Sequence, residues 1–293
     1  MGKARKRRLG DRSDGRRIRM LEPYNAMIPF IMKEKSDASN YFYDAIEITE
    51  AEKFLRKKRT NGYPGMGFLH LFIAAYIRTV SQYPGVNRFC SGQRVYARHN
   101  IEYVMTVKRE LKASSPETSV KVIFEPRDTI NDVYDKLNVE IEKVKAAGEA
   151  TSTDDVAKTL MKLPRLFLKF VVFFLGLLDY FGKMPKMILK ASPFHGSMII
   201  TELGSIGMPP IYHHLYNFGN MPIFIAIGAK RKAYELKSDG SPVERKYIDF
   251  KVVADERICD GFYFSQAFRL LRSMLRDPQA LDGPPETVVE DID

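Results

Sequence analysis

The spacing of apolar residues predicts several helices along the chain. From about residue 66 to 82 apolar side chains fall on nearly every side of the expected helix, which is typical of a central buried helix. A last helix is expected from about 262 to 276, before Pro278. Between 128 and 148 the period predicts an amphipathic helix that packs on a sheet, because apolar residues recur every third or fourth position: Ile130, Val133, Leu137, Ile141 and Val144.

Local signals predict the limits of one further helix. Thr49 and Glu52 have the spacing of a capping box, in which a hydroxyl and a carboxylate accept from the first free backbone amides. We therefore expect a helix from Thr49 to about Arg59. Residues 61–65, which combine Asn, Gly and Pro, predict a break before the next helix.

Short β-prone runs predict the strands. They lie at 101–107 and 120–124, and then at 197–203, 223–228 and 247–254 in the second half of the chain. Residues 237–240, Lys-Ser-Asp-Gly, form a turn signal that joins the last two strands as a hairpin. Helices and strands are mixed without a regular βαβ rhythm. The pattern predicts an α+β fold, a two-layer α/β sandwich with helices on one face of a mixed sheet.

The most lipid-like segment runs from Leu166 to Leu178 and is interrupted by Lys169. It is shorter than the roughly 20 residues that a membrane-spanning helix needs. Two interpretations are open: an interfacial helix over 166–190 on an anionic bilayer, or a helix buried in the core or against a partner subunit. The first interpretation rests on flanking basic residues, which are Lys162, Arg165, Lys183, Lys186 and Lys190.

Charge divides the 293-residue chain, whose net charge is +10, into three parts. Residues 1–20 hold nine basic and two acidic residues, whereas residues 282–293 hold five acidic residues and no basic one. We expect a solvated, disordered basic tail over 1–20, a domain over 21–281 and an acidic tail over 282–293. A basic excess suits an anionic ligand, a membrane or a nucleic acid. Nucleic-acid binding rests on the tail alone, since no recognised module is present, and we do not expect it.

The two cysteines, Cys90 and Cys259, have no neighbours at zinc-binding spacing. This usage fits a reducing, cytoplasmic compartment and predicts no structural metal. The basic N-terminus is not followed by an uninterrupted apolar stretch, so no signal peptide is expected.

The motif that bears on chemistry is residues 255–262, Asp-Glu-Arg-Ile-Cys-Asp-Gly-Phe, between a strand end and a helix start. It resembles the His-x-x-x-Asp-Gly motif of the chloramphenicol acetyltransferase superfamily, which includes the catalytic domain of dihydrolipoyl acyltransferases of 2-oxo acid dehydrogenase complexes. Further blocks resemble the family in the right order over roughly residues 20–278: Met27-Ile28-Pro29, Arg56 with Arg59, Tyr63-Pro64 to Tyr83-Pro84, Asn87-Arg88, and Ser197-x-x-x-Thr201-x-Leu203-Gly204-x-x-Gly207.

The resemblance implies a homotrimer with active sites between subunits and coenzyme A as a substrate. By position, Thr201 would donate a hydrogen bond to the oxyanion from the neighbouring subunit. Asp260 would be a structural carboxylate that orients the loop through an ion pair with an arginine. Gly261 would allow close approach at the turn into the helix, and Gly204 and Gly207 belong to the Thr201 block. No lipoyl or subunit-binding domain is recognised, so we expect a stand-alone protein.

The departure from the family is Glu256, which stands where the family has histidine. A free carboxylic acid, with a pKa of about 4.3, accepts a proton from a thiol less readily than an imidazole does, by roughly 3 kcal/mol or about a hundredfold. Burial of a carboxylic acid in an apolar channel can recover this difference. The alternatives are that the site is inactive, or that Glu256 pairs with Arg257 or another cation.

Other histidines are candidate bases in place of Glu256. His195 precedes the Thr201 strand, and His213-His214 follow Gly207. We therefore predict a CoA-dependent acyltransferase that transfers an acyl group between CoA and a small thiol or hydroxyl acceptor. Thr201 would polarise the carbonyl, and Glu256 or a neighbouring histidine would handle the proton. The alternative is a catalytically inactive trimer that serves as a ligand-binding or interaction scaffold.

Overall fold

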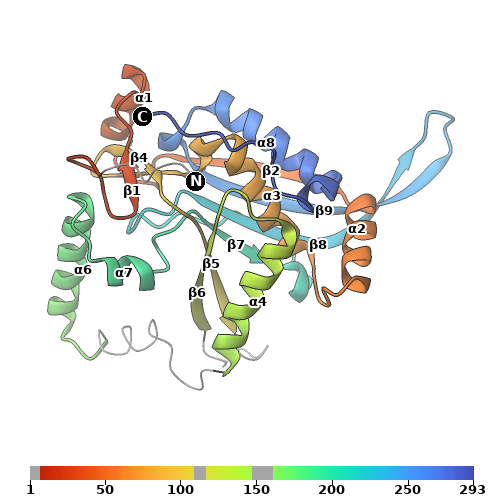
Figure 1. Cartoon of the computed structure of the whole chain (residues 1–293), viewed down its shortest axis with the longest axis horizontal. Coiled ribbons are helices and arrows are strands. Elements are labelled where there is room, and N and C mark those ends of the chain that lie inside the picture. Colours follow the sequence, from red (N-terminus) through yellow and green to blue (C-terminus); the bar gives the residue numbers. More distant parts are fainter. Residues whose placement is uncertain (1–6, 109–116, 147–160) are drawn as a thin grey trace.

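A six-stranded mixed sheet is the centre of the computed structural model, which describes residues 7–108, 117–146 and 161–293 (Figure 1). β7 pairs in parallel with β5 and β8, and the remaining neighbours are antiparallel. The spatial order of its strands is β2 (Ser39–Glu47), β9 (Pro242–Asp255), β8 (Ile223–Leu236), β7 (Met198–Glu202), β5 (Ile101–Lys108) and β6 (Glu117–Phe124).

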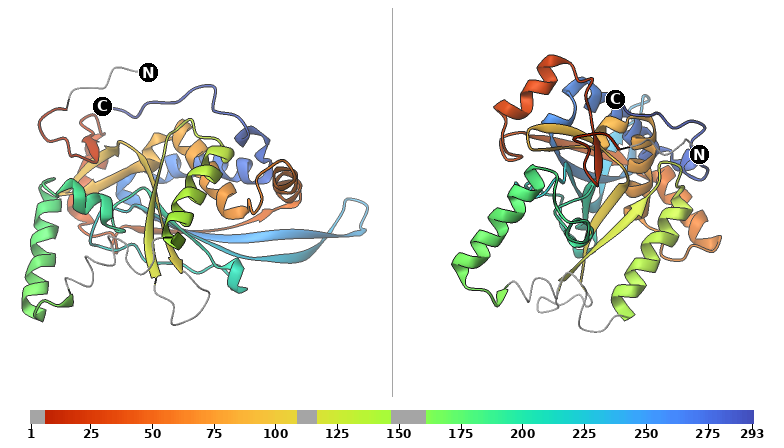
Figure 2. Two further views of the ribbon diagram at one scale, coloured as in Figure 1. Left: turned by 60° about the horizontal axis from the view of Figure 1, so that its bottom comes forward. Right: turned by 60° about the vertical axis from the view of Figure 1, so that its left-hand side comes forward.

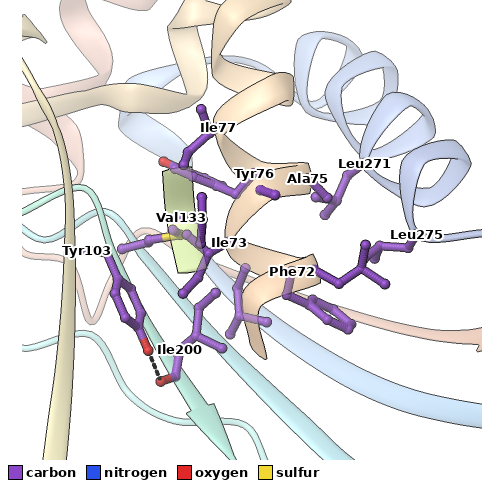
Figure 3. Packing of buried hydrophobic residues seen from close by; sticks show 14 of the residues in the cluster. Phe72, Ile73, Ala75, Tyr76, Ile77, Tyr103, Val133, Ile200, Leu271 and Leu275 are labelled. Atoms are coloured by element: carbon purple, nitrogen blue, oxygen red, sulfur yellow. Dashed lines mark hydrogen bonds between the residues drawn. The ribbon is translucent and has the colours of Figure 1, made fainter. Parts of the chain in front are cut away.

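Helices cover one face of this sheet and enclose the main core. They are α2 (Thr49–Thr60), α3 (Phe68–Gln82), α4 (Ile130–Ala146) and α8 (Gly261–Arg276) (Figure 1). α3 is the central helix, and Phe72 and Ile73 pack between Ile200 of the sheet and Leu271 of α8 (Figure 3). The predicted two-layer α+β fold with helices on one face of a mixed sheet is confirmed, as are the helices expected at 66–82 and 262–276. The helix expected between 128 and 148 is confirmed up to residue 146, and 147–148 lie outside the described residues.

The predicted hairpin is longer than its apolar runs suggested. β8 and β9 are each 14 residues, and they extend past the sheet as a two-stranded arm (Figures 1 and 2). Lys237 and Ser241 close its turn through a backbone hydrogen bond of 2.9 Å, and Gly240 adopts a φ of 77°. Charged residues cover the arm, which is why the apolar pattern missed the outer half of each strand.

The capping box expected at Thr49 is not formed. The Thr49 hydroxyl donates to Glu47, which precedes the helix. The Glu52 carboxylate is instead bound by Lys230 at 2.6 Å and Lys246 at 3.0 Å from the adjacent strands. Tertiary ion pairs therefore take the carboxylate that a local cap requires.

Part of the expected basic tail is folded, contrary to the prediction of a solvated extension. Gly15–Arg17 form β1, the edge strand of a small antiparallel sheet with β4 (Arg94–Arg98) and β3 (Arg88–Ser91). Arg12 is buried because its guanidinium pairs with Asp14 at 2.8 Å and with Asp179 at 2.6 Å.

The acidic C-terminal segment also lies against the body. Asp291 forms a bidentate pair with the buried Arg88, at 2.8 and 2.5 Å. The backbone amides of Arg19 and Met20 donate to the carbonyl of Asp293. Arg8 and Arg16 also form ion pairs with Asp293, so neither end is a free tail throughout.

The remaining elements are α1 (Pro23–Ile31), α6 (Arg165–Tyr180), α7 (Lys186–Ala191) and short 3-10 turns. α6 stands apart from the two layers, at one end of the molecule (Figures 1 and 2). The sequence left open that residues 166–178 form a helix buried in the core. The exposure of α6 rules this out. Among the helices that the structure describes, none is long and apolar enough to cross a bilayer.

Candidate active site

Glu256 lies at the point where β9 ends and α8 is about to begin. β9 ends at Asp255, a short 3-10 turn covers Glu256–Ile258, and α8 starts at Gly261. The backbone amide of Glu256 donates to the carbonyl of Ala38, which fixes the turn to the start of β2.

An ion pair within the motif holds this turn rigid. The guanidinium of Arg257 forms two hydrogen bonds of 2.8 Å with the two carboxylate oxygens of Asp255. The same guanidinium donates to the carbonyls of Met32 and Lys33, just after α1. Because both members are buried, Asp255 neutralises Arg257 and leaves it no free charge for Glu256.

Glu256 is one of the residues that line a small pocket beside α1. The lining also includes Leu21, Asn25 and Ile28 from the segment of α1, together with Arg88 and Tyr263. Within residues 7–108, 117–146 and 161–293, no cation forms an ion pair with Glu256. The alternative that Glu256 pairs with Arg257 is therefore wrong, since Arg257 pairs with Asp255.

Asp260 is structural, but in a different way from the one that the resemblance implied. Its Oδ1 accepts a 2.8 Å hydrogen bond from the backbone amide of Tyr263, which makes it the N-cap of α8. No arginine in the described part of the chain pairs with Asp260, since Arg257 binds Asp255 and Arg88 binds Asp291. A Cβ at Gly261 would meet no atom within 4 Å, so the chain itself makes no close approach there.

Thr201 lies at the end of β7 and contacts His213. Its Oγ1 is 3.2 Å from Nε2 of His213, whose ring stacks on Phe224 with centroids 4.1 Å apart. Burial, with the neighbouring His214, lowers the pKa of His213, which favours the neutral imidazole. The loop histidine that the sequence placed near Thr201 is therefore in direct contact with it.

Glycines shape the turn after Thr201. A Cβ at Gly204 would come within 2.6 Å of the Glu202 carboxylate and 2.9 Å of the Gly228 carbonyl. Gly207 ends the following turn with a φ of 72°, in the left-handed region that favours glycine.

Thr201 and Glu256 are far apart within one chain. Thr201 is in register with Ala226 and, one strand further, with Lys251. Glu256 follows Lys251 by five residues in the direction of β9, which adds about 16 Å along the sheet. The two side chains therefore cannot serve one reacting group inside a single copy.

His195 belongs to a different, buried cluster. Its Nδ1 is 2.8 Å from the Ser192 hydroxyl, and its Nε2 is 3.4 Å from the carboxylate of Asp179. Burial lowers the pKa of His195, although Asp179 opposes the shift. At 1% exposure and without a contact to Thr201 or Glu256 among the described residues, His195 is a structural neighbour of α6 and not part of the candidate site.

Both cysteines are buried and free. Burial raises the pKa of Cys259 far above its ordinary value and that of Cys90 to about 12, so both thiols stay protonated. Nowhere in the described ranges do three or more His, Cys, Asp or Glu side chains form a group that could hold a metal ion.

Sequence reasoning missed the wall that α1 adds to the pocket. Ile28 lies in the Met27-Ile28-Pro29 block, which resembled the family by its order along the chain, and Asn25 lies in no predicted motif. It also missed Asp291 as the partner of Arg88. The sequence shows a basic Arg88 and an acidic C-terminal segment. No local pattern predicts that two residues 203 positions apart form a pair.

The fold and the site's position define the class of protein: the chain has a chloramphenicol acetyltransferase-like fold. It is similar in structure to a probable dihydrolipoamide acetyltransferase from Listeria monocytogenes (TM-score 0.56, 12% identity, 88% of this chain and 94% of that chain). A dihydrolipoamide acetyltransferase from Azotobacter vinelandii gives a TM-score of 0.56 at 13% identity, with 88% of each chain covered. A chloramphenicol acetyltransferase gives a TM-score of 0.50 at 11% identity, with 88% of this chain and 99% of that chain covered.

No family model matches the sequence, and no curated protein matches it. At these identities the comparisons establish the fold, and the expectation of this fold from the sequence motifs is confirmed.

Proposed function

We propose that this protein is a CoA-dependent acyltransferase in which Glu256 accepts the proton of a small thiol or hydroxyl acceptor. The observation that carries the proposal is Glu256, a residue that lines the pocket and whose carboxylate forms no ion pair with a cation in the described chain. A carboxylate neutralised by a guanidinium would be a much weaker base, because the opposite charge favours its ionised form. Asp255 and Asp291 neutralise the two arginines of the pocket instead.

Thr201 is the proposed oxyanion donor, supplied by a second copy. The distance across the sheet between Thr201 and Glu256 supports a site between copies rather than within one. An exposed apolar surface on α1, beside the pocket, supports an interface there: Tyr24, Met27, Phe30 and Ile31 are 49–69% exposed. A homotrimer with interfacial sites, as the fold resemblance implies, satisfies both requirements.

His213 positions the Thr201 hydroxyl in this proposal. A hydroxyl has one hydrogen, so Thr201 donates to an oxyanion only when it accepts a hydrogen bond from its other neighbour. The neutral His213 supplies that hydrogen bond through Nε2–H, and its stacking on Phe224 fixes the ring.

The proposed reaction is an acyl transfer in two steps. Glu256 takes the proton from the acceptor's thiol or hydroxyl as its sulfur or oxygen bonds to the carbonyl carbon of acyl-CoA. Thr201 stabilises the resulting oxyanion. When the carbon–sulfur bond to CoA breaks, the CoA thiolate takes the proton back from Glu256, so Glu256 returns to its starting state.

Acyl transfer from acetyl-CoA to dihydrolipoamide, with other acyl-CoAs as further donors, tests the proposal. The wild type is expected to be active and Glu256→Gln to be inactive, while calorimetry shows that both bind CoA. If CoA does not bind, or if no acyl-CoA is turned over, the proposal fails.

An inactive scaffold is the second candidate, favoured by the replacement of the family's histidine. Glu256→His separates the two candidates, because restoring the imidazole gives turnover to a protein that has lost only this group. An inactive wild type together with an active Glu256→His variant establishes the scaffold.

A further inference from the structure

α6 is an apolar helix that the rest of the described chain leaves uncovered. Asp179 is its only buried residue. The helix points away from the two layers in both views of Figure 2. Its exposed apolar side chains, at 41–81% exposure, are Leu166, Phe167, Phe170, Val172, Phe173, Phe174 and Leu177.

These side chains form a continuous ridge. Phe167, Phe170 and Phe174 are spaced three and four residues apart and therefore lie on one side of the helix. Their ring centroids are 6.5 and 6.3 Å apart in sequence order. Phe173 and Leu177 widen the same side. On α7, which follows, Met187 adds an apolar side chain at 80% exposure.

Basic residues surround this ridge without acidic partners. From 161 to 191 the sole acidic residue is Asp179, whose carboxylate is buried against Arg12. The basic residues form no ion pair within the described ranges, and they are Lys162, Arg165, Lys169, Lys183, Lys186 and Lys190. The surface therefore combines Phe and Leu with uncompensated positive charge.

We propose that α6 and the adjacent basic residues up to Lys190 bind the surface of an anionic bilayer. In this arrangement the helix lies in the plane of the membrane with the Phe ridge at the acyl chain boundary and the lysines at the phosphates. At 16 residues α6 is shorter than the roughly 20 that cross a bilayer, so it fits the interface and not the interior.

Charge favours a lipid surface over a second copy of this chain. Residues 161–191 hold six basic residues and no acidic residue but the buried Asp179, so two copies meeting at α6 would bring lysines against lysines. Protein interfaces are also depleted in lysine at their cores. An anionic bilayer supplies both the apolar medium and the opposite charge.

Contacts at the C-terminal end of α6 fix the helix to the rest of the protein; we call these contacts the mount of α6. Asp179 bonds to Arg12 at 2.6 Å, and its carbonyl accepts from the Ser91 hydroxyl at 3.1 Å. A Cβ at Gly92 would come within 2.3 Å of the Tyr180 carbonyl, so the end of α6 rests directly on the turn between β3 and β4. The helix is therefore held by its C-terminal end, and the rest of it is presented outward.

Co-sedimentation of the full chain with vesicles tests this proposal. One set of vesicles is phosphatidylcholine alone, and the other holds equal amounts of phosphatidylcholine and phosphatidylglycerol. We expect binding to the second set only, weakened by added salt. The double variant Phe170→Glu with Phe173→Glu is expected to lose roughly tenfold or more of this binding, because it places charge on the inserted face.

Leu236→Glu is the matched control, since Leu236 is an apolar residue at 77% exposure on the β8–β9 arm, away from α6. It should bind anionic vesicles as the wild type does. Absence of wild-type binding, or unchanged binding by the double variant, overturns the proposal. A double variant that changes only the oligomeric state in size-exclusion chromatography also overturns it, in favour of a second copy. The acyl-transfer assay is independent of all these outcomes.

Discussion

At the scale of single residues, the site depends on which carboxylate neutralises which guanidinium. Asp255 forms an ion pair with Arg257, and Asp291 forms one with Arg88. Glu256 is therefore left without a cation partner in the part of the chain that the structure describes. The sequence placed Asp255, Glu256 and Arg257 in one motif, but it placed Asp291 in an acidic tail, and charge type alone does not reveal the pairing.

The first residue-scale prediction concerns the base. Glu256→Gln keeps the size of the side chain and removes its proton acceptor, so kcat for acyl transfer should fall by about a hundredfold or more. Steady-state kinetics with acetyl-CoA measure this change. An equal kcat in wild type and variant would exclude Glu256 as the base.

The second concerns Asp260, whose carboxylate caps α8. Asp260→Ala should lower the free energy of unfolding by about 1 kcal/mol, whereas Asp260→Asn should lose much less because asparagine also caps a helix. Urea unfolding compares the two variants. A loss as large in Asp260→Asn as in Asp260→Ala would instead indicate an ion pair with an arginine.

At the scale of elements, periodicity predicted α4 and α8 because each buries one apolar face, whereas the largely apolar run at 66–82 predicted α3, which is buried on all sides. It missed the small sheet of β1, β4 and β3, in which Arg88 and Arg98 are buried and beside which Arg12, just before β1, is buried as well. Buried arginines need partners that lie far away in the chain, and local pattern contains no information about them. For α6 the sequence predicted the helix but not its surroundings.

The element-scale prediction concerns the mount of α6. Asp179→Asn removes a charge that faces Arg12 and His195, so the free energy of unfolding should fall by about 3 kcal/mol near neutral pH. Ser192→Ala, which removes only the neutral partner of His195, is the control and should lose less. A loss in Asp179→Asn no larger than in the control would contradict the role of this ion pair.

Low pH should weaken the contacts of Asp179 with Arg12 and His195, which hold the end of α6, and so lower the free energy of unfolding. Burial raises the pKa of Asp179, but the nearby His195 and Arg12 outweigh burial and hold the pKa below its ordinary 3.8. Its stabilisation is therefore complete above 3.8 and is lost as the pH falls further. The lowered pKa of His195 acts in the same direction, since its contribution declines as the pH falls below 6.5. Unfolding at a series of pH values should show a shallower acid decline in Asp179→Asn than in the wild type.

At the scale of the whole molecule, the two charged ends belong to the fold. Arg8 and Arg16 reach Asp293, and Arg88 reaches Asp291 beside the candidate pocket. The expectation of free tails failed because composition reports charge but not the distance between opposite charges in the folded chain.

Removal of residues 1–18 is therefore expected to destabilise the protein by several kcal/mol, since it takes away β1 and the partner of Asp179. Thermal unfolding measures the loss. A melting temperature equal to that of the full chain would restore the solvated-tail interpretation.

The central claim is that Glu256 of one copy and Thr201 of another form one acyltransferase site. Mixing subunits tests it most directly: Glu256→Gln and Thr201→Val are purified separately, unfolded, and refolded together. Each variant alone should be nearly inactive. In random mixtures about a quarter of the interfaces unite an intact Glu256 with an intact Thr201, so about a quarter of wild-type activity should return. A mixture that stays as inactive as its components, beside an active wild type refolded in the same way, would contradict the account.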